Sequence, residues 1–146
     1  MPAGLIPNEG LAVTLRELLG AVAPGVLPWQ MMFWKNNIVP TVNTVLANLT
    51  ESDWGNYSRL TLSRDGWTVP TVVAGCAHST WGTEPTVWTV TGGPAQTPYG
   101  YAYVDVELGV IRFVQRFDDE DIEPIIVPGV VKVLPEYTLT SHECED

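Results

Sequence analysis

Residues 99–117 read YGYAYVDVELGVIRFVQRF, and this stretch decides the fold class of the chain. Its first half alternates tyrosines with small or apolar residues, and its second half places isoleucine and phenylalanines on one face and two arginines on the other. Side chains of a β-strand point to alternate faces, so each half is typical of a strand. Glu107-Leu108-Gly109 supplies a turn between them. The stretch therefore predicts an antiparallel β-hairpin.

The sequence around this hairpin continues in short apolar stretches separated by turn residues. Further strands are expected at residues 29–34, 57–63, 67–73, 86–90, 125–127, 130–134 and 137–139. Asp65-Gly66 predicts a hairpin turn between two of these strands, and Pro70 places the second of them at a sheet edge or a bulge. Short strands at this regular spacing favour a mainly β fold, an antiparallel β-sandwich or jelly-roll-like domain.

One short α-helix is expected near the N-terminus. Leucine or valine recurs at helical spacing at Leu11, Leu15, Leu18, Leu19 and Val22. Asn8 is a suitable N-cap, and Gly20 followed by Pro24-Gly25 ends the pattern. We therefore expect a single β-sandwich domain over residues 1–146, with an N-terminal arm and helix at 1–25 and an acidic tail at 140–146.

Charge excludes some classes of partner. The chain has 17 acidic and 7 basic residues and a net charge of −10, of which −8 falls in residues 105–146. Seven scattered cations cannot form a footprint on phosphates, so no nucleic acid is expected as a partner. No apolar run approaches the ~18 residues of a membrane span, and residues 1–4 lack the basic segment of a signal peptide.

Catalytic motifs are not found. The sequence contains no P-loop, no dinucleotide-binding glycine pattern, no G-x-S-x-G and no metalloprotease histidine pair. Ser79 follows His78, but neighbours along a strand point to opposite faces, so the two do not form a nucleophile and its base. We therefore expect no enzyme activity and no cofactor.

Two Cys/His pairs leave a metal site open. Cys76 and His78 are spaced i,i+2, and so are His142 and Cys144. Two such pairs that faced each other could bind zinc. This possible zinc site is the one basis for an enzyme hypothesis. There are two alternatives to a zinc site. One is a Cys76–Cys144 disulfide, and the other is a pair of unpaired cysteines, with Cys76 buried and Cys144 exposed on the tail. The acidic run 118–123 lacks the spacing of an EF-hand loop, and we expect it to be a solvated turn rather than a calcium site.

Aromatic residues carry the remaining signal, with six Trp and five Tyr. Large rings can fill a thin sandwich core or can anchor a protein or sugar partner. Tyr99, Tyr101 and Tyr103 share one face of their strand. The opposite face is small and apolar enough to be the core side, so this tyrosine stripe is the better candidate for a contact surface.

Several short stretches occur in an order that resembles a known class of protein. These are Leu5-Ile6-Pro7-Asn8-Glu9-Gly10, Asn36-Asn37, Val39-Pro40-Thr41, Leu49-Thr50-Glu51, residues 57–62, Trp67, Tyr99-Gly100-Tyr101 with Val104-Asp105, Arg116-Phe117, Val133-Leu134-Pro135 and Tyr137-Thr138-Leu139. The order resembles small virion structural proteins of tailed bacteriophages, over nearly the whole chain. The resemblance implies a β-sandwich with a leading helix, a structural role and no catalytic residues.

Two functions are compatible with this resemblance. The first is a capsid decoration or cement protein, made in the host cytoplasm and placed on the head exterior of the virion. It would be a homo-oligomer that binds the major capsid protein or other virion proteins. The second is a head-fibre or tail-associated component that recognises host-surface carbohydrate through rings on loops 52–57 and 79–85. The candidate interface residues are Leu5, Ile6, Pro7, Leu11, Leu15, Tyr99, Tyr101 and Tyr103.

Overall fold

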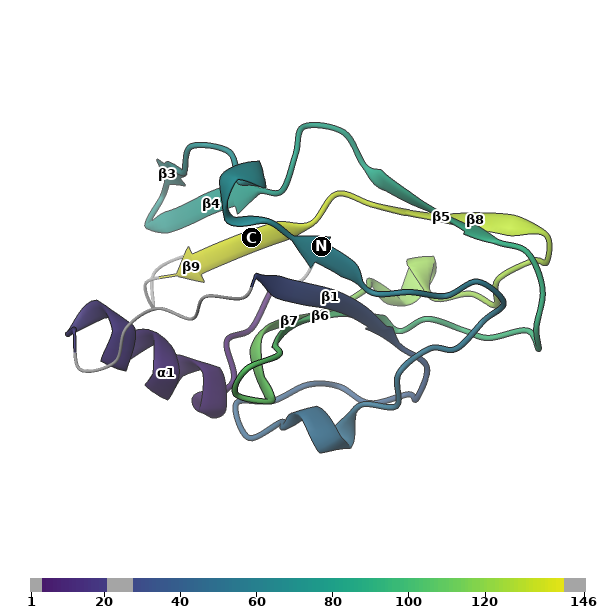
Figure 1. Ribbon diagram of the computed structural model, residues 1–146, viewed down its shortest axis with the longest axis horizontal. Helices are drawn as coiled ribbons and strands as arrows, with labels where there is room; N and C mark the ends of the chain where they lie inside the picture. The colour runs from purple at the N-terminus through teal and green to yellow at the C-terminus, as the bar shows by residue number, and fades with distance from the viewer. Residues whose placement is uncertain (1–3, 21–27, 141–146) are drawn as a thin grey trace.

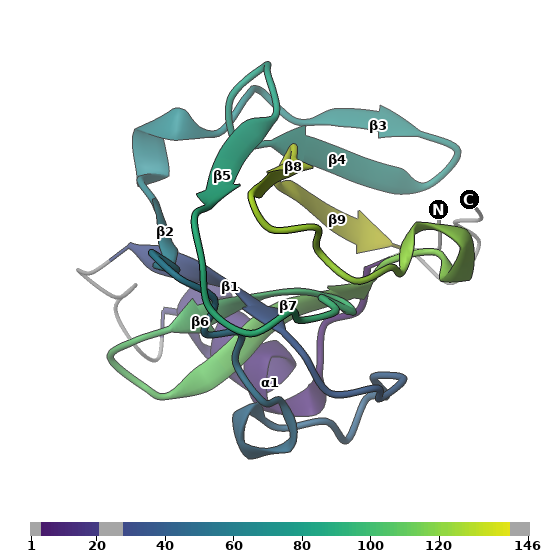
Figure 2. The same ribbon diagram turned by 90° about the vertical axis from the view of Figure 1, so that its right-hand side faces the viewer.

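The computed structural model describes residues 4–20 and 28–140 (Figure 1). Within these residues the chain forms one α-helix and nine β-strands, all paired antiparallel. The strands lie in two layers, and the helix lies outside the larger sheet (Figure 2). The fold is therefore mainly β and sandwich-like with one N-terminal helix, which confirms the expected fold class.

The larger layer is a four-stranded sheet in the order β2-β1-β6-β7. Its strands are β1 (Trp29–Trp34), β2 (Leu60–Leu62), β6 (Gly100–Asp105) and β7 (Val110–Arg116). The predicted hairpin forms β6 and β7, and Gly109 adopts the positive φ of 67° that the turn requires. Strand β6 also pairs with β1, from Gln30 opposite Val104 to Trp34 opposite Gly100. The hairpin thus forms half of the sheet.

The second layer contains two smaller sheets, β3-β4-β9 and β5-β8. Their strands are β3 (Thr71–Val73), β4 (Cys76–Thr80), β5 (Thr86–Val90), β8 (Gly129–Val133) and β9 (Glu136–Thr140). A hydrogen bond from the Trp81 N–H to the Pro135 carbonyl joins the two sheets where β4 leads to β5 and β8 leads to β9. The second layer is therefore made of two adjoining sheets that the connections β4–β5 and β8–β9 link.

The main core lies between the two layers. It consists of Met31, Phe33, Trp54, Leu62, Trp88, Val90, Tyr101, Tyr103 and Phe113. Neighbouring rings meet edge to face, as Phe33 does with Trp88 at a centroid distance of 4.8 Å, or tilted, or stacked, as Tyr103 does with Phe113 at 5.2 Å. Large aromatic side chains thus fill a core built from short strands.

The outer face of the large sheet is also covered. A second apolar cluster forms there from Met32, Trp34, Leu49, Ala102, Val104, Ile111 and Val114. Residues 38–50, with the 3₁₀ turn Leu46–Asn48, pack over part of this face. The N-terminal segment pairs with the β7 edge through reciprocal 2.8 Å hydrogen bonds between Leu5 and Val114, and α1 (Asn8–Leu18) follows it along β7.

Several local predictions were wrong or incomplete. Asp65-Gly66 lies in a 3₁₀ turn, Arg64–Gly66, that carries the chain from β2 in one layer to β3 in the other, so it does not close a hairpin. Residues 125–127 form no strand. Strand β4 was not predicted, and the turn that precedes it, Ala74-Gly75, has positive φ at both residues. Pro70 does precede an edge strand, β3.

The helix is shorter than its leucine pattern suggested. It runs from Asn8 to Leu18, and Pro7 rather than Asn8 is its N-cap residue. Gly20 with φ of 72° follows its end. Residues 1–3 and 21–25 of the expected arm and helix, and residues 141–146 of the expected acidic tail, lie outside the described residues.

Candidate interaction surface

The tyrosine stripe is not a contact surface. Tyr101 and Tyr103 are only 2% and 0% exposed, because the second layer covers the face of β6 that they share. The Tyr101 hydroxyl donates to Gln115 Oε1 at 2.9 Å, and the Tyr103 hydroxyl donates to the Glu136 carbonyl at 2.5 Å. Burial raises the pKa of both phenols above the ordinary value. Tyr99 is half-buried on the other side, where the Arg116 guanidinium lies 5.3 Å from its ring centre.

The other aromatic side chains are also covered by the rest of the chain. All Trp, Tyr and Phe residues of the chain lie in the described ranges, and none is exposed. Trp54, in the loop proposed to bind sugar, is 3% exposed within the main core. Trp81, in the second such loop, is half-buried and donates its Nε1–H to the Ser63 carbonyl at 3.1 Å. The aromatic side chains therefore belong to the packed interior, and these loops present no exposed ring for a sugar to stack on.

Helix α1 packs against β7 with its polar face rather than its leucine face. Gly10 is the buried residue of the helix, and a Cβ there would lie 2.2 Å from the Ile111 carbonyl oxygen. Only glycine lets the helix backbone approach β7 this closely. Beside it, the Glu9 carboxylate accepts a 2.7 Å hydrogen bond from the Ile111 N–H. The first turn of α1 is thus fixed on the strand by a small residue and an acid.

Arg112 fixes the second half of the helix. Its side chain is 2% exposed and donates to Glu17 at 2.8 and 3.1 Å and to Asp105 at 3.0 Å. It also donates to the Thr14 hydroxyl at 3.3 Å, and the Trp29 ring centre lies 4.8 Å from its guanidinium carbon. Burial disfavours the cation, but hydrogen bonds and charge from Glu17, together with Asp105, outweigh it and raise the pKa of Arg112. This buried ionic network sets the rotation of α1.

The consequence is an exposed apolar surface along the helix, here named the leucine ridge. It consists of Leu11 (51% exposed), Leu15 (54%), Leu18 (77%) and Leu19 (74%). On a helix held by its polar face, these leucines point away from the sheet. Contiguous exposed apolar patches on a protein surface are often functional. Leu11 and Leu15 were predicted interface residues, and the structure places both on this ridge.

The remaining predicted interface residues belong to the N-terminal segment. Leu5 packs against the outer apolar cluster, Ile6 packs against the main core, and Pro7 is buried at the start of α1. Leu5 and Ile6 are thus engaged with the chain's own cores, and Pro7 is covered by the fold. The leucine ridge is therefore the part of the predicted set that stays available to a partner. Leu18 and Leu19, named in the sequence only as helix positions, extend it.

The chain matches no protein-family model, no curated protein and no solved structure. Among the described residues, no helix has the length and apolar character needed to cross a membrane.

The Cys/His pairs do not come together as a described metal site. Cys76 is buried and disulfide-bonded, so its sulfur is not a thiolate ligand. His142 and Cys144 lie outside the described residues. His78 Nδ1 lies 3.0 Å from a Glu136 carboxylate oxygen across the β4–β9 pair. Ser79 instead donates to the Thr68 carbonyl at 2.7 Å, so it is not the hydrogen-bond partner of His78.

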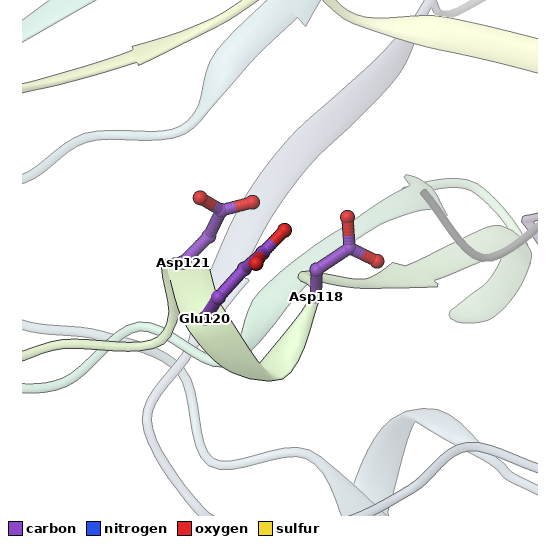
Figure 3. Close-up of side chains that lie close together, drawn as sticks. All are labelled: Asp118, Glu120 and Asp121. Atoms are coloured by element: carbon purple, nitrogen blue, oxygen red, sulfur yellow. The ribbon is translucent and has the colours of Figure 1, made fainter.

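The acidic run forms an exposed turn beside a cavity. Asp118, Glu120 and Asp121 bring carboxylate oxygens within 4.8 Å of one another around the 3₁₀ turn Asp119–Asp121 (Figure 3). Glu120 and Asp121 are exposed, and exposed acidic groups of this kind are common without a metal. A cavity of about 750 Å³ opens next to this turn, between residues 117–126 and β8.

Proposed function

We propose that this protein is a non-enzymatic virion structural protein that acts by binding other proteins, and that it decorates and stabilises a bacteriophage capsid. The observation that carries the binding role is the leucine ridge, an apolar helix face presented to solvent by a buried ionic network. The order of short motifs that resembles small phage virion proteins supports the virion assignment. In this proposal the partners are the major capsid protein or other virion proteins, and further copies of the chain.

The ridge has the energetics of an interface core. Covering a leucine side chain fully contributes about 1.5 to 3 kcal/mol relative to leaving it exposed. Four leucines that are half to three-quarters exposed thus offer several kcal/mol before the costs of association are subtracted. This amount suits a weak single contact. A decoration protein makes many such contacts over one capsid, so its attachment is strengthened by multiplicity.

The ridge is also pre-organised. Arg112, Glu9 and Gly10 hold α1 at both ends of its inner face, so its leucines are displayed before a partner arrives. Binding then loses little conformational entropy in ordering the helix. Stabilisation follows from mass action, because a protein that binds the closed shell and not the opened one shifts the equilibrium toward the closed shell.

The test is a binding experiment with particles of the phage that encodes the chain, assembled without it. We expect the purified protein to sediment with these particles and to raise the temperature at which they release their genome. The double variant L15Q/L18Q should lose at least tenfold in affinity, because two polar amides replace the centre of the apolar surface. The variant V69Q changes a residue that is 86% exposed next to β3, and it should bind like the native chain.

Three results would reject the proposal. They are absence of particle binding by the native chain, unchanged heat resistance of the particles, and equal binding by L15Q/L18Q and V69Q. Thermal unfolding of each variant shows whether a loss of binding reflects the ridge or the fold. Carbohydrate recognition, the alternative function, depended on exposed rings on the loops 52–57 and 79–85, and Trp54 and Trp81 are packed into the protein there.

A further inference from the structure

A second surface lies along β8, at the other end of the molecule from α1 (Figure 1). The cavity of about 750 Å³ beside β8 is here named the β8 groove. Its apolar lining includes Tyr101 from β6, Phe117 directly after β7, and Ile125, Val131 and Val133 from the segments around it. A space of this size exceeds what one small side chain fills, and it lies within the range of ligand pockets.

The groove runs along an edge of β8. Residues 129–134 are consecutive, and all of them line the cavity. Because alternate side chains of a strand point to opposite faces, a cavity that touches every residue in a row follows the strand's edge. Among the described strands β8 pairs only with β5, so its other edge offers backbone N–H and C=O groups without a strand partner. An edge of this kind is a template for one more strand.

The lining of the groove is acidic. Asp121 and Glu123 come from the segment around the acidic turn, and Glu136 comes from the start of β9, where its carboxylate also lies 3.0 Å from His78 Nδ1. Lys132 is the one cation among the lining residues. Asp118 and Glu120 lie next to Asp121 on the same turn (Figure 3). Charge complementarity therefore selects a positively charged occupant, and the unpaired backbone edge selects one with peptide groups of its own.

We propose that the β8 groove binds an extended, basic segment of a partner polypeptide, which adds to the free edge of β8 as a further strand. Alternate side chains of such a strand point to opposite sides, so one set is apolar and packs on the half-buried Phe117 and Ile125. The other set is Lys or Arg and faces the carboxylates of Asp121 and Glu123. Because β8 has five residues, the segment it accommodates is about five or six residues long.

The probe is a six-residue peptide of alternating lysine and valine, blocked at both ends and labelled with a fluorophore. Anisotropy titration with the full chain should show saturable binding, weakened about tenfold or more when salt rises from 50 to 500 mM because the attraction is screened. A peptide of alternating glutamate and valine should not bind. A lysine–valine peptide methylated on alternate backbone nitrogens should lose binding at least tenfold, since it cannot pair with the strand edge.

The protein variants separate local charge from net charge. D121N/E123Q neutralises two carboxylates that line the groove, and D65N/E84Q neutralises two exposed carboxylates outside it. Both pairs change the net charge equally, and thermal unfolding checks that both fold. We expect the first pair to weaken binding about fivefold or more and the second to leave it within twofold.

The outcomes decide the proposal directly. No saturable binding of the lysine–valine peptide, equal effects of the two variant pairs, or full binding of the methylated peptide would each overturn it. The groove is distinct from the leucine ridge, so L15Q/L18Q should bind this peptide like the native chain. A failure here leaves the proposed function standing, and a failure of particle binding leaves this inference standing.

Discussion

Replacing Arg112 by leucine tests the claim that a buried ionic network sets the position of α1. The change removes four hydrogen bonds, two to Glu17, one to Asp105 and one to Thr14. Glu17 is 18% exposed and can turn toward water, but the Asp105 side chain is only 6% exposed. The hydrogen bond that the Asp105 carboxylate keeps comes from the Leu108 N–H at 3.3 Å. The variant therefore leaves a carboxylate buried without its cation.

Breaking a buried ion pair by removing one partner costs about 3 to 5 kcal/mol, mostly because of the charge left behind. Loss of the contact with the Trp29 ring, 4.8 Å away, adds about 1 kcal/mol, and the apolar leucine offsets part of the total. We expect the free energy of unfolding to fall by about 4 kcal/mol. For a chain of this length that corresponds to a drop in Tm of roughly 10 °C.

The assay is urea unfolding followed by tryptophan fluorescence. A matched control is R116L on the same strand, whose guanidinium donates to the Ile38 carbonyl and to Asn37 and is 17% exposed. We expect R116L to lose about 1 to 2 kcal/mol, since water can replace these partners. Adding D105N to R112L should recover about 1 to 2 kcal/mol by removing the buried charge. A loss in R112L no larger than in R116L, or no recovery with D105N, would show that the buried charge pair does not hold α1 in place.

Three further predictions follow from local contacts. G10A should destabilise the chain by about 2 kcal/mol or more in the same urea assay, because its Cβ would lie 2.2 Å from the Ile111 carbonyl oxygen and the helix would have to shift. L15Q/L18Q should change the free energy of unfolding by less than about 1 kcal/mol, since both leucines are exposed; a larger loss would mean that the ridge supports the fold. Burial works to raise the pKa of Glu51, but hydrogen bonds from Arg59 and Tyr57 bring it below the ordinary 4.5. A lowered pKa in the folded state adds stability that is present above about pH 4.5 and lost as pH falls further. Urea titrations at several pH values should therefore show a stability gap between the native chain and E51Q that narrows in acid, and a gap that stays constant would contradict the assignment.

The parts of the fold that the sequence predicted are those governed by neighbours along the chain. Strands β1 and β5 begin and end at the predicted residues, and the 99–117 stretch forms the predicted hairpin. In these stretches the alternation and the turn residues carry the information locally. Strand β4 was missed because Cys76–Thr80 mixes small and polar residues and has no alternation to reveal it.

The candidate site needed information from distant residues. Alternation placed the tyrosines of β6 on one face, but it could not tell that both faces of the large sheet are covered, by the second layer and by residues 38–50. Leucines at helical spacing indicated a helix with an apolar face, and the usual expectation turns that face inward. The opposite rotation depends on Glu17 meeting Arg112, which lies 95 residues away in the sequence.

The rotation of α1 is energetically informative. A buried ion pair is often no more stabilising than apolar residues of similar volume. Placing the leucines on β7 and the acids in water would bury more apolar area than the observed arrangement does. The chain instead combines a buried arginine, two acids on α1 and a glycine at the contact, and all of these favour one orientation of the helix. Such a combination specifies a surface at the expense of apolar burial, which is the pattern expected where the exposed leucines have a partner. With the acidic β8 groove at the other end of the molecule, the chain presents two separate surfaces of different chemistry, one apolar and one acidic.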